Sequence, residues 1–189
     1  MGIVMCGRYY IELDSDELME IVFKAQRKAE QIEQKVADGE VRPSEMAAVI
    51  DEQGKVMPMR WGLKRFDNKG LIINARSETI KEKPMFRQLR RCVIPASGYY
   101  EWHQDSKEKF AFYLPDKAIL YFAGLYEEPF GANEVARFVI LTRQATPLLE
   151  PVHSRMPVIL PQHCVRPWLY EDAAVFEEAI EEILYELVI

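Results

Sequence analysis

The chain has 189 residues, of which 49% are hydrophobic, and this length fits one compact domain and leaves too little for a second full one. No apolar run is long enough to span a bilayer, and the first residues lack the charged start and long apolar stretch of a signal peptide, so we expect a soluble, cytoplasmic protein with no membrane contact. The three cysteines, Cys6, Cys92 and Cys164, are widely spaced without a Cys-x-x-Cys pattern, which argues against a disulfide framework and a zinc site. The only close metal-type pair is His163 with Cys164, and adjacent residues rarely point at one ion, so no metal is expected.

The net charge of −6 argues against a polyanionic partner, but the charge is unevenly distributed. The last nineteen residues, 171–189, contain seven acidic residues and no lysine or arginine. Without them, the preceding part of the chain has a net charge of +1. A local basic groove is therefore compatible with the acidic total, and nucleic-acid binding is permitted.

The first predicted element is an amphipathic helix. Asp14 is a candidate N-cap with Glu17 three residues later, and apolar residues follow at helical spacing from Leu18 to Val36. Gly39 is expected to follow the end of this helix.

The middle of the chain is dominated by short strand patterns. Residues 47–51 and 56–60 flank a polar turn in which Gly54 can supply the positive φ of a tight reversal, so they predict a β-hairpin. Polar or proline-bearing turns separate the further predicted strands, which are 99–102, 110–114, 119–124, 138–142 and 157–160.

Residues 171–189 are expected to form an acidic C-terminal helix. Its glutamates lie mostly opposite an apolar face that consists of Val175, Phe176, Ile180, Ile183 and Leu184. The order of a helix, many short strands and a helix predicts a single α+β domain, built on a mainly antiparallel, barrel-like sheet with flanking helices.

Cys6 is the first candidate reactive group. The adjacent Gly7 and Arg8 leave it accessible and help to stabilise a thiolate, although an ordinary buried cysteine is an equally good interpretation of the spacing alone. If translation starts at Met5, removal of that methionine makes Cys6 the first residue, with an α-amine of pKa about 8 beside its thiol. Such a 1,2-aminothiol attacks an aldehyde first through nitrogen and then through sulfur, which closes a thiazolidine.

Glu101 and His153 are candidate proton-transfer groups. Glu101 lies in an aromatic run where desolvation would raise its pKa, although a glutamate at a strand end often simply faces solvent. His153 lies between Pro151 and Pro157, in a constrained turn that leads into a strand. A lone histidine is more often structural than catalytic, so its role depends on its partners.

Several other residues are suited to binding a nucleic acid. Asn74 can orient a small polar substrate, and Arg8 and Arg76 can hold phosphates by bidentate contacts. Trp61 can stack on an exposed base, although most aromatic residues in such apolar surroundings belong to a core.

The order of these motifs resembles one known family, the SOS-response-associated peptidase (SRAP) family. The matching stretches run from Met5 to Pro157, and their combination in one order is far more specific than any one of them. They are Met-Cys-Gly-Arg-Tyr, Trp-Gly-Leu, Asn-Ala-Arg-Ser-Glu, Arg-Cys-x-x-Pro-x-x-Gly-Tyr-Tyr-Glu-Trp, Leu-Thr-x-x-Ala and His-x-Arg-Met-Pro.

Members of this family bind single-stranded DNA and crosslink covalently to abasic sites, which protects damaged replication intermediates. The resemblance implies that Cys6 is the nucleophile that forms the thiazolidine, that Asn74 positions it, and that Glu101 and His153 handle the protons of crosslink formation and reversal. The remaining roles that it implies are phosphate contacts by Arg8 and Arg76, shaping of the pocket by Met156 and Pro157, and contacts with displaced bases by Trp61 and Pro43.

The sequence departs from the family pattern at two places. Met1-Gly2-Ile3-Val4 precede Met5, and if they remain, the nitrogen of Cys6 is an amide that cannot form a Schiff base. We prefer initiation at Met5 over self-cleavage of this leader or a retained leader and an inactive protein. The loop 40–44 also lacks the asparagine and threonine that many members carry, which leaves its DNA contacts in doubt.

Two other functions fit the same residues. One is a thiol autoprotease or amidohydrolase, in which Cys6 attacks an amide and His153 or Glu101 is the base. The other is a non-covalent single-stranded DNA binder with a buried Cys6. The expected partner is single-stranded DNA with abasic sites, including sites at junctions with duplex, and the expected protein is a monomer that associates with the nucleoid and needs no cofactor.

Overall fold

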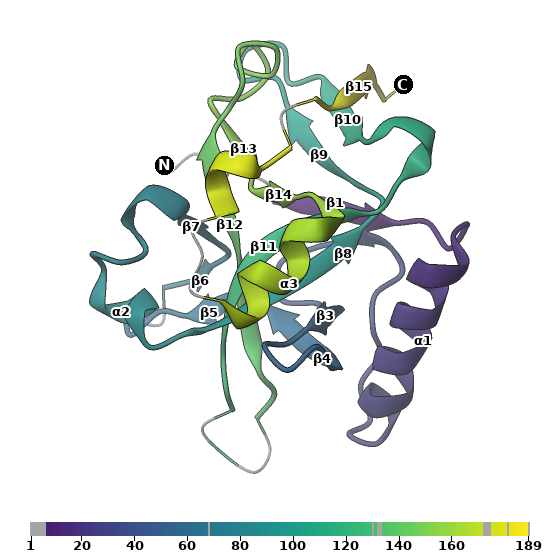
Figure 1. Cartoon of the computed structure of the whole chain (residues 1–189), viewed down its shortest axis with the longest axis vertical. Coiled ribbons are helices and arrows are strands. Elements are labelled where there is room, and N and C mark those ends of the chain that lie inside the picture. Colours follow the sequence, from purple (N-terminus) through teal and green to yellow (C-terminus); the bar gives the residue numbers. More distant parts are fainter. Residues whose placement is uncertain are drawn as a thin grey trace.

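The centre of the fold is a closed ring of five strands (Figure 1). The computed structural model describes residues 7–67, 69–129, 131, 134–171, 175–180 and 182–188, without the side chains of Val175 and Glu177. The five strands in ring order are β12 (Arg137–Gln144), β4 (Val56–Trp61), β3 (Met46–Ile50), β8 (Arg90–Ala96) and β11 (Leu120–Glu127). Each strand pairs with the next, and β12 closes the ring by pairing in parallel with β4 and antiparallel with β11.

A second sheet of five antiparallel strands lies beside this barrel. In sheet order its strands are β15 (Leu184–Leu187), β10 (Lys109–Tyr113), β9 (Gly98–Trp102), β1 (Arg8–Ile11) and β2 (Gly39–Val41). Strands β8 and β9 follow one another with only Ser97 between them, so the chain passes directly from the barrel into the second sheet.

Short strands extend the barrel at its edges. The strands β7 (Asn74–Arg76) and β13 (Arg155–Pro157) both pair with β12, and β14 (Ile159–Leu160) pairs with β11. The strands β5 (Leu63–Lys64) and β6 (Leu71–Ile72) form a separate hairpin.

The helices cover the outside of the sheets (Figure 1). Helix α1 (Asp16–Glu30) packs against β3 and β4, and α3 (Gln162–Tyr170) packs against β8 and β11. Helix α2 (Pro84–Arg87) is a single turn, and the three 3-10 turns are η1 (Ser77–Thr79), η2 (Pro115–Lys117) and η3 (Val175–Glu178). Within the described ranges, no helix has both the length and the apolar character needed to cross a bilayer.

The predicted α+β class, the barrel-like sheet and the strands in the middle of the chain are confirmed. The predicted hairpin is β3 and β4, and Gly54 in its turn has a φ of 73°. Asp51 stabilises this turn because its Oδ1 accepts hydrogen bonds of 2.8 Å from the backbone N–H groups of Gln53 and Lys55.

The predicted limits of the first helix were wrong at both ends. The N-cap is Ser15, whose Oγ accepts from the backbone N–H of Leu18, and Asp14 lies outside the helix. The helix ends at Glu30, well before Val36. Val36 instead forms a parallel bridge with Met46, so its burial comes from the sheet and not from a helical face.

The predicted C-terminal helix was also wrong. Within the described part of 171–189, η3 is a short 3-10 turn and β15 is a strand that pairs with β10. Leu184–Leu187 satisfies the hydrogen-bonding groups at the edge of β10, and the ring of Tyr185 packs 5.6 Å from that of Phe112 between centroids. The structure forms a helix earlier, α3, which the sequence pattern did not indicate.

Candidate functional site

Glu101 and His153, which are far apart in the sequence, line one pocket of about 390 Å³. Glu101 lies near the end of β9, and His153 lies just before β13. Both side chains are buried, with exposed fractions of 4% and 5%. The rest of the wall consists of Trp102, the last residue of β9, and of His103, Gln104, Asp105 and Lys107 in the loop to β10. The structure therefore brings together the two predicted proton-transfer groups.

His153 is held in a fixed orientation by its own backbone neighbourhood. Its N–H donates to the carbonyl of Leu149 at 3.1 Å, which closes a turn before β13. On the ring, Nδ1 lies 3.1 Å from the backbone nitrogen of Arg155, which donates to it, whereas Nε2 is buried without a hydrogen-bond partner among the described residues. Burial lowers the pKa of His153 below its usual value, and this effect outweighs the hydrogen bond with the Arg155 backbone, which raises the pKa. The imidazole is therefore neutral at pH 7 and can accept a proton.

Arg155 is a site residue that the sequence did not single out. Its guanidinium forms a two-bonded ion pair with Glu78, with distances of 2.6 and 2.8 Å to Oε1 and Oε2, and also donates to the carbonyl of Thr142 at 2.7 Å. These contacts join β13, β12 and η1 beside His153. Arg155 is the arginine of the His-x-Arg-Met-Pro motif in the sequence. Its partner Glu78, the glutamate of the Asn-Ala-Arg-Ser-Glu motif, can be identified only from the fold.

Asn74 and Arg76 reach the same region through β7. In β7, Arg76 is opposite Thr142 of β12, and Thr142 is in turn opposite Pro157 of β13, so the two motif strands flank one central strand. The side-chain Nδ2 of Asn74 is buried and has no hydrogen-bond partner among the described residues. Arg76 is exposed. Asn74 can therefore donate its side-chain N–H to a ligand, and the exposed side chain of Arg76 is accessible to one.

Arg8 lies at the beginning of β1, opposite Tyr100 of β9. Its guanidinium carbon lies 5.7 Å from the centre of the Trp102 ring, and its Nη1 is paired with Glu40 Oε1. The predicted nucleophile, Cys6, lies outside the described residues.

The structure buries Trp61, for which a base contact was predicted, and the two residues that were predicted to shape the pocket. Trp61 is 0% exposed, with its ring 5.2 Å from that of Tyr9 and its Nε1 donating to the carbonyl of Ile73. Met156 and Pro157 are also buried, and Pro43 is half-buried. The stacking role predicted for Trp61 does not fit this structure because neither face of its ring is open. Phe66, between β5 and β6, is 95% exposed and does present an aromatic ring to solvent.

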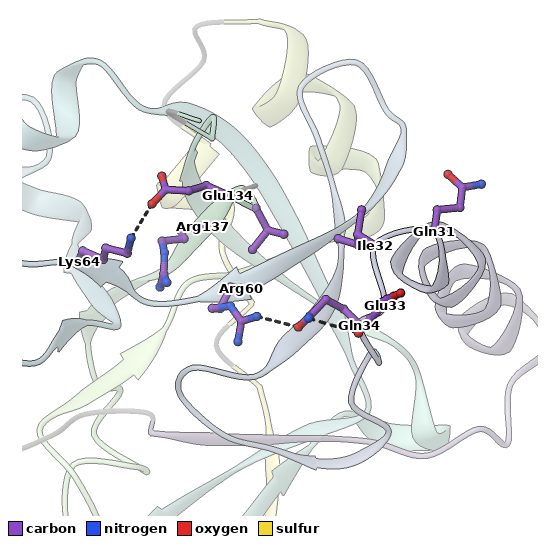
Figure 2. A pocket seen from close by; sticks show the side chains of 9 residues that line it. Gln31, Ile32, Glu33, Gln34, Arg60, Lys64, Glu134 and Arg137 are labelled. Carbon is purple, nitrogen blue, oxygen red and sulfur yellow. Dashed lines mark hydrogen bonds and ion pairs between the residues drawn. The ribbon is translucent and has the colours of Figure 1, made fainter. Parts of the chain in front are cut away.

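A larger pocket, of about 690 Å³, lies away from these residues (Figure 2). It is bounded by the chain after α1 and by residues of β4, β5 and β12. Figure 2 shows that its polar side chains largely bind each other, since Arg60 donates to Gln34 Oε1 at 2.9 Å and Lys64 pairs with Glu134 at 2.7 Å. None of the predicted site residues lines this pocket, and we assign it no role in the reaction.

The cysteine–histidine pair 163–164 has a third neighbour in the structure. The His163, Cys164 and Glu178 ligand atoms lie within 4.8 Å of one another. The expectation that these adjacent side chains would not converge was therefore wrong. They converge on Glu178, whose Oε2 lies 3.2 Å from His163 Nε2 and accepts from Cys164 Sγ at 3.4 Å. Burial raises the pKa of the Cys164 thiol, as does its hydrogen bond with Glu178. The thiol is therefore protonated at neutral pH.

Known proteins resemble this chain in both sequence and fold. The chain is 34% identical over 188 residues to the abasic site processing protein YoqW of Bacillus subtilis, a match that covers 87% of this chain and 80% of that protein. It is 27% identical to the abasic site processing protein YedK of Escherichia coli, over 89% of this chain and 81% of the relative. Its fold matches a solved structure of a Bacteroides thetaiotaomicron protein with a TM-score of 0.78 and 24% identity, over 97% of this chain and 92% of that chain.

The family assignment rests on a match to almost the whole chain. The family model for the SOS response associated peptidase (SRAP) matches residues 5–187. That range includes the pocket of Glu101 and His153, the Asn74 strand and the Arg155–Glu78 pair. The chain therefore belongs to the SRAP family.

Proposed function

We propose that this protein binds single-stranded DNA and forms a covalent thiazolidine crosslink with abasic sites through Cys6. The observation that carries the proposal is the pocket in which Glu101 and His153 meet, bordered by Trp102, over which Arg8 of β1 lies. The relatives named abasic site processing proteins support the same substrate. The action would protect damaged replication intermediates in the cytoplasm, at the nucleoid.

The covalent chain limits how far Cys6 can lie from Arg8. Consecutive Cα atoms are about 3.8 Å apart, so the Cα of Cys6 lies within about 7 Å of that of Arg8 in any conformation. Arg8 is opposite Tyr100, the residue before Glu101. We propose that a nucleophile at position 6 reaches the two proton-transfer groups across this short tether.

The chemistry needs only groups of the chain and the DNA aldehyde. The α-amine of Cys6 adds to the aldehyde carbon of the ring-opened sugar, and loss of water gives a Schiff base. The thiol then adds across the C=N bond, so that sulfur bonds to carbon and the thiol proton ends on nitrogen. One water is released overall. Reversal follows the same steps backwards, which makes the reaction lyase-like and self-reversing.

Glu101 and His153 have different parts in this sequence of steps. Glu101 supplies the proton that lets the carbinolamine oxygen leave as water. The neutral His153, with its unpartnered Nε2, accepts the proton of the thiol and returns it to the nitrogen. Asn74 uses its free amide N–H to hold the sugar oxygen or the nucleophile in place.

DNA recognition rests on charge and shape. An abasic nucleotide has no base edge, so contacts with phosphates, by Arg8 and Arg76, determine affinity and little sequence preference is expected. Abasic sites at junctions between single and double strands are also proposed substrates, and the last base pair of a duplex can stack on an exposed aromatic ring such as Phe66. A monomer is sufficient for this mode of binding.

The mechanism requires a free α-amine on Cys6. We therefore propose that translation begins at Met5 and that methionine removal exposes Cys6. The intact mass of the expressed protein reports directly on this point, because a chain that begins at Cys6 is lighter by the masses of residues 1–5.

The test uses protein that begins at Cys6 and single-stranded DNA with one abasic site. After incubation, a denaturing gel is expected to show a shifted band that requires the aldehyde and is lost in Cys6→Ala. α-Acetylated protein is the matched control, since it keeps the thiol and blocks only the amine. Equal crosslinking by acetylated protein would show that the thiazolidine mechanism is wrong.

The same samples distinguish the two alternative functions. A thiol autoprotease or amidohydrolase would release the leader from the longer chain, or cleave an amide, in a reaction lost in Cys6→Ala. A non-covalent binder would give no band that survives denaturation, and Cys6→Ser would bind DNA unchanged.

A further inference from the structure

Three cationic side chains from separate parts of the second sheet and its loops converge on one carboxylate, that of Glu40. Arg8 Nη1 pairs with its Oε1, Arg42 Nε lies 3.2 Å from the same oxygen, and Lys109 Nζ lies 3.0 Å from Oε2. Arg8 comes from β1, Lys109 from β10, and Arg42 directly follows β2, which contains Glu40. We call these four residues the Glu40 cluster.

The Glu40 cluster is cationic and lies over aromatic rings. One carboxylate cannot neutralise three cations, so the cluster keeps a net charge of +2. Lys109 Nζ lies 3.6 Å from the centre of the Tyr100 ring, and Arg8 lies over Trp102. Trp102 also lines the pocket of Glu101 and His153. The cluster therefore borders the proposed reaction site.

Glu40 is ionised throughout the working pH range. Its partial burial raises the pKa, but hydrogen bonds from Lys109 and Arg8 outweigh this and hold the pKa at about 2. Its side chain is 25% exposed, and those of Lys109 and Arg8 are 26% and 35% exposed. These groups are accessible enough for an external anion to reach them.

We infer that Arg8, Arg42 and Lys109 form a binding site for a phosphodiester group of the DNA strand, and that the Glu40 carboxylate occupies this site when DNA is absent. A carboxylate and a phosphate accept the same bidentate hydrogen bonds from guanidinium groups, so the two compete for one set of donors. The assignment of this phosphate to a DNA strand rests on the proposed function. The site adds Arg42 and Lys109 to the phosphate contacts proposed for Arg8 and Arg76. The Glu40 carboxylate competes with the DNA phosphate for the same donors.

The competition has a consequence for selectivity. A strand that binds here must displace the carboxylate or remain beside its negative charge, so non-covalent binding is weakened for intact and abasic DNA alike. Only an abasic site can then form the covalent bond, which does not depend on the strength of this phosphate contact. Glu40 thus lets the protein leave undamaged DNA while it remains on damaged DNA.

The test compares Glu40→Gln with wild-type protein by fluorescence anisotropy, using intact single-stranded DNA. The variant keeps the size of the side chain and removes its charge, and we expect binding tighter by about 3- to 10-fold at low salt. The dependence of log K on log salt is expected to steepen, since each phosphate newly contacted on a single strand adds about 0.7 to the slope. Glu20→Gln is the matched control, since Glu20 pairs with Lys24 on α1, outside the Glu40 cluster, and the substitution makes the same change in net charge.

A second variant distinguishes release of the three cations from a general effect of net charge on DNA binding. In the Glu40→Gln background, Lys109→Gln is expected to remove most of the gain in affinity, because it removes one of the released donors. Unchanged or weaker binding by Glu40→Gln, or a gain no larger than that of Glu20→Gln, would overturn the inference. The outcome of this binding test is separate from that of the crosslinking test. If no covalent product forms, the proposed function fails, but tighter binding by Glu40→Gln would still support the phosphate site.

Discussion

The backbone N–H of Arg155 donates a 3.1 Å hydrogen bond to Nδ1 of His153, and the arginine side chain on the same residue is held by Glu78. Arg155 thus fixes the ring of the histidine, whose pKa is lowered chiefly by burial. The free Nε2 is left for the proton of another group.

The rate of crosslinking is expected to fall at acidic pH as His153 becomes protonated. Because burial lowers the pKa of His153, the midpoint is expected below the usual value of about 6.5. The check is the rate of crosslink formation from pH 5 to 8, with DNA in excess. His153→Gln should be slow at every pH and should lose the inflection, whereas His163→Gln, an exposed histidine, should keep the wild-type profile.

Glu101→Gln is expected to slow both formation and reversal of the crosslink, by about 100-fold or more, because an amide cannot donate or accept the proton of the leaving water. DNA binding should persist, since Glu101 is buried in the pocket wall. Rates from denaturing gels, together with anisotropy on intact DNA, separate these effects. Glu108→Gln, on the exposed loop nearby, serves as the control, and a wild-type rate in Glu101→Gln would remove Glu101 from the proton path.

The Glu78–Arg155 pair is expected to contribute about 1 kcal/mol to stability at pH 7, a modest value because the Glu78 side chain is 49% exposed. The hydrogen bond from Arg155 lowers the pKa of Glu78, so this contribution is present above the unfolded value of about 4.5 and is lost as the pH falls through the lower folded value. Urea unfolding of wild type and Glu78→Gln should therefore differ at pH 7 and converge toward pH 3. A difference that does not shrink on acidification would contradict the assignment.

β15 is expected to stabilise the second sheet. Tyr185→Ala removes the ring that packs on Phe110 and Phe112 and should cost about 1 to 2 kcal/mol in urea unfolding. Leu148→Ala, at a side chain that is 55% exposed, should change stability by less than about 0.5 kcal/mol. Equal effects of the two substitutions would mean that β15 adds no stability to the edge of β10.

Thiol labelling distinguishes Cys6 from the other cysteines. Cys92 and Cys164 are 0% and 2% exposed, and burial raises the pKa of both thiols. Brief treatment of native protein with a maleimide is expected to give one adduct, mapped to Cys6 by mass spectrometry, with three after denaturation. An unlabelled Cys6 in native protein would favour the interpretation of Cys6 as a buried core residue.

Local patterns were sufficient for much of the fold. The hairpin around Gly54 follows from a turn sequence between two apolar runs, and both parts of that signal lie within a few residues. The limits of α1 were less well predicted because an apolar residue such as Val36 is equally compatible with a helix face and with a bridge to Met46. The chain after Tyr170 was mispredicted because the open edge of β10 overrides a helical pattern there, and no short window of sequence contains that edge.

The sequence by itself determined the family, because the motif order around Glu101, His153 and Asn74 is typical of one family and the chain belongs to it. The catalytic roles of these residues stay predictions, and only the tertiary structure decided which side chains lie together. The pairing of Glu78 with Arg155, the burial of Trp61 and the convergence of three cations on Glu40 depend on strands that are distant in the chain. Contacts of this kind arise from sheet pairing and packing, and the free energy that selects them is a property of the whole fold rather than of any local segment.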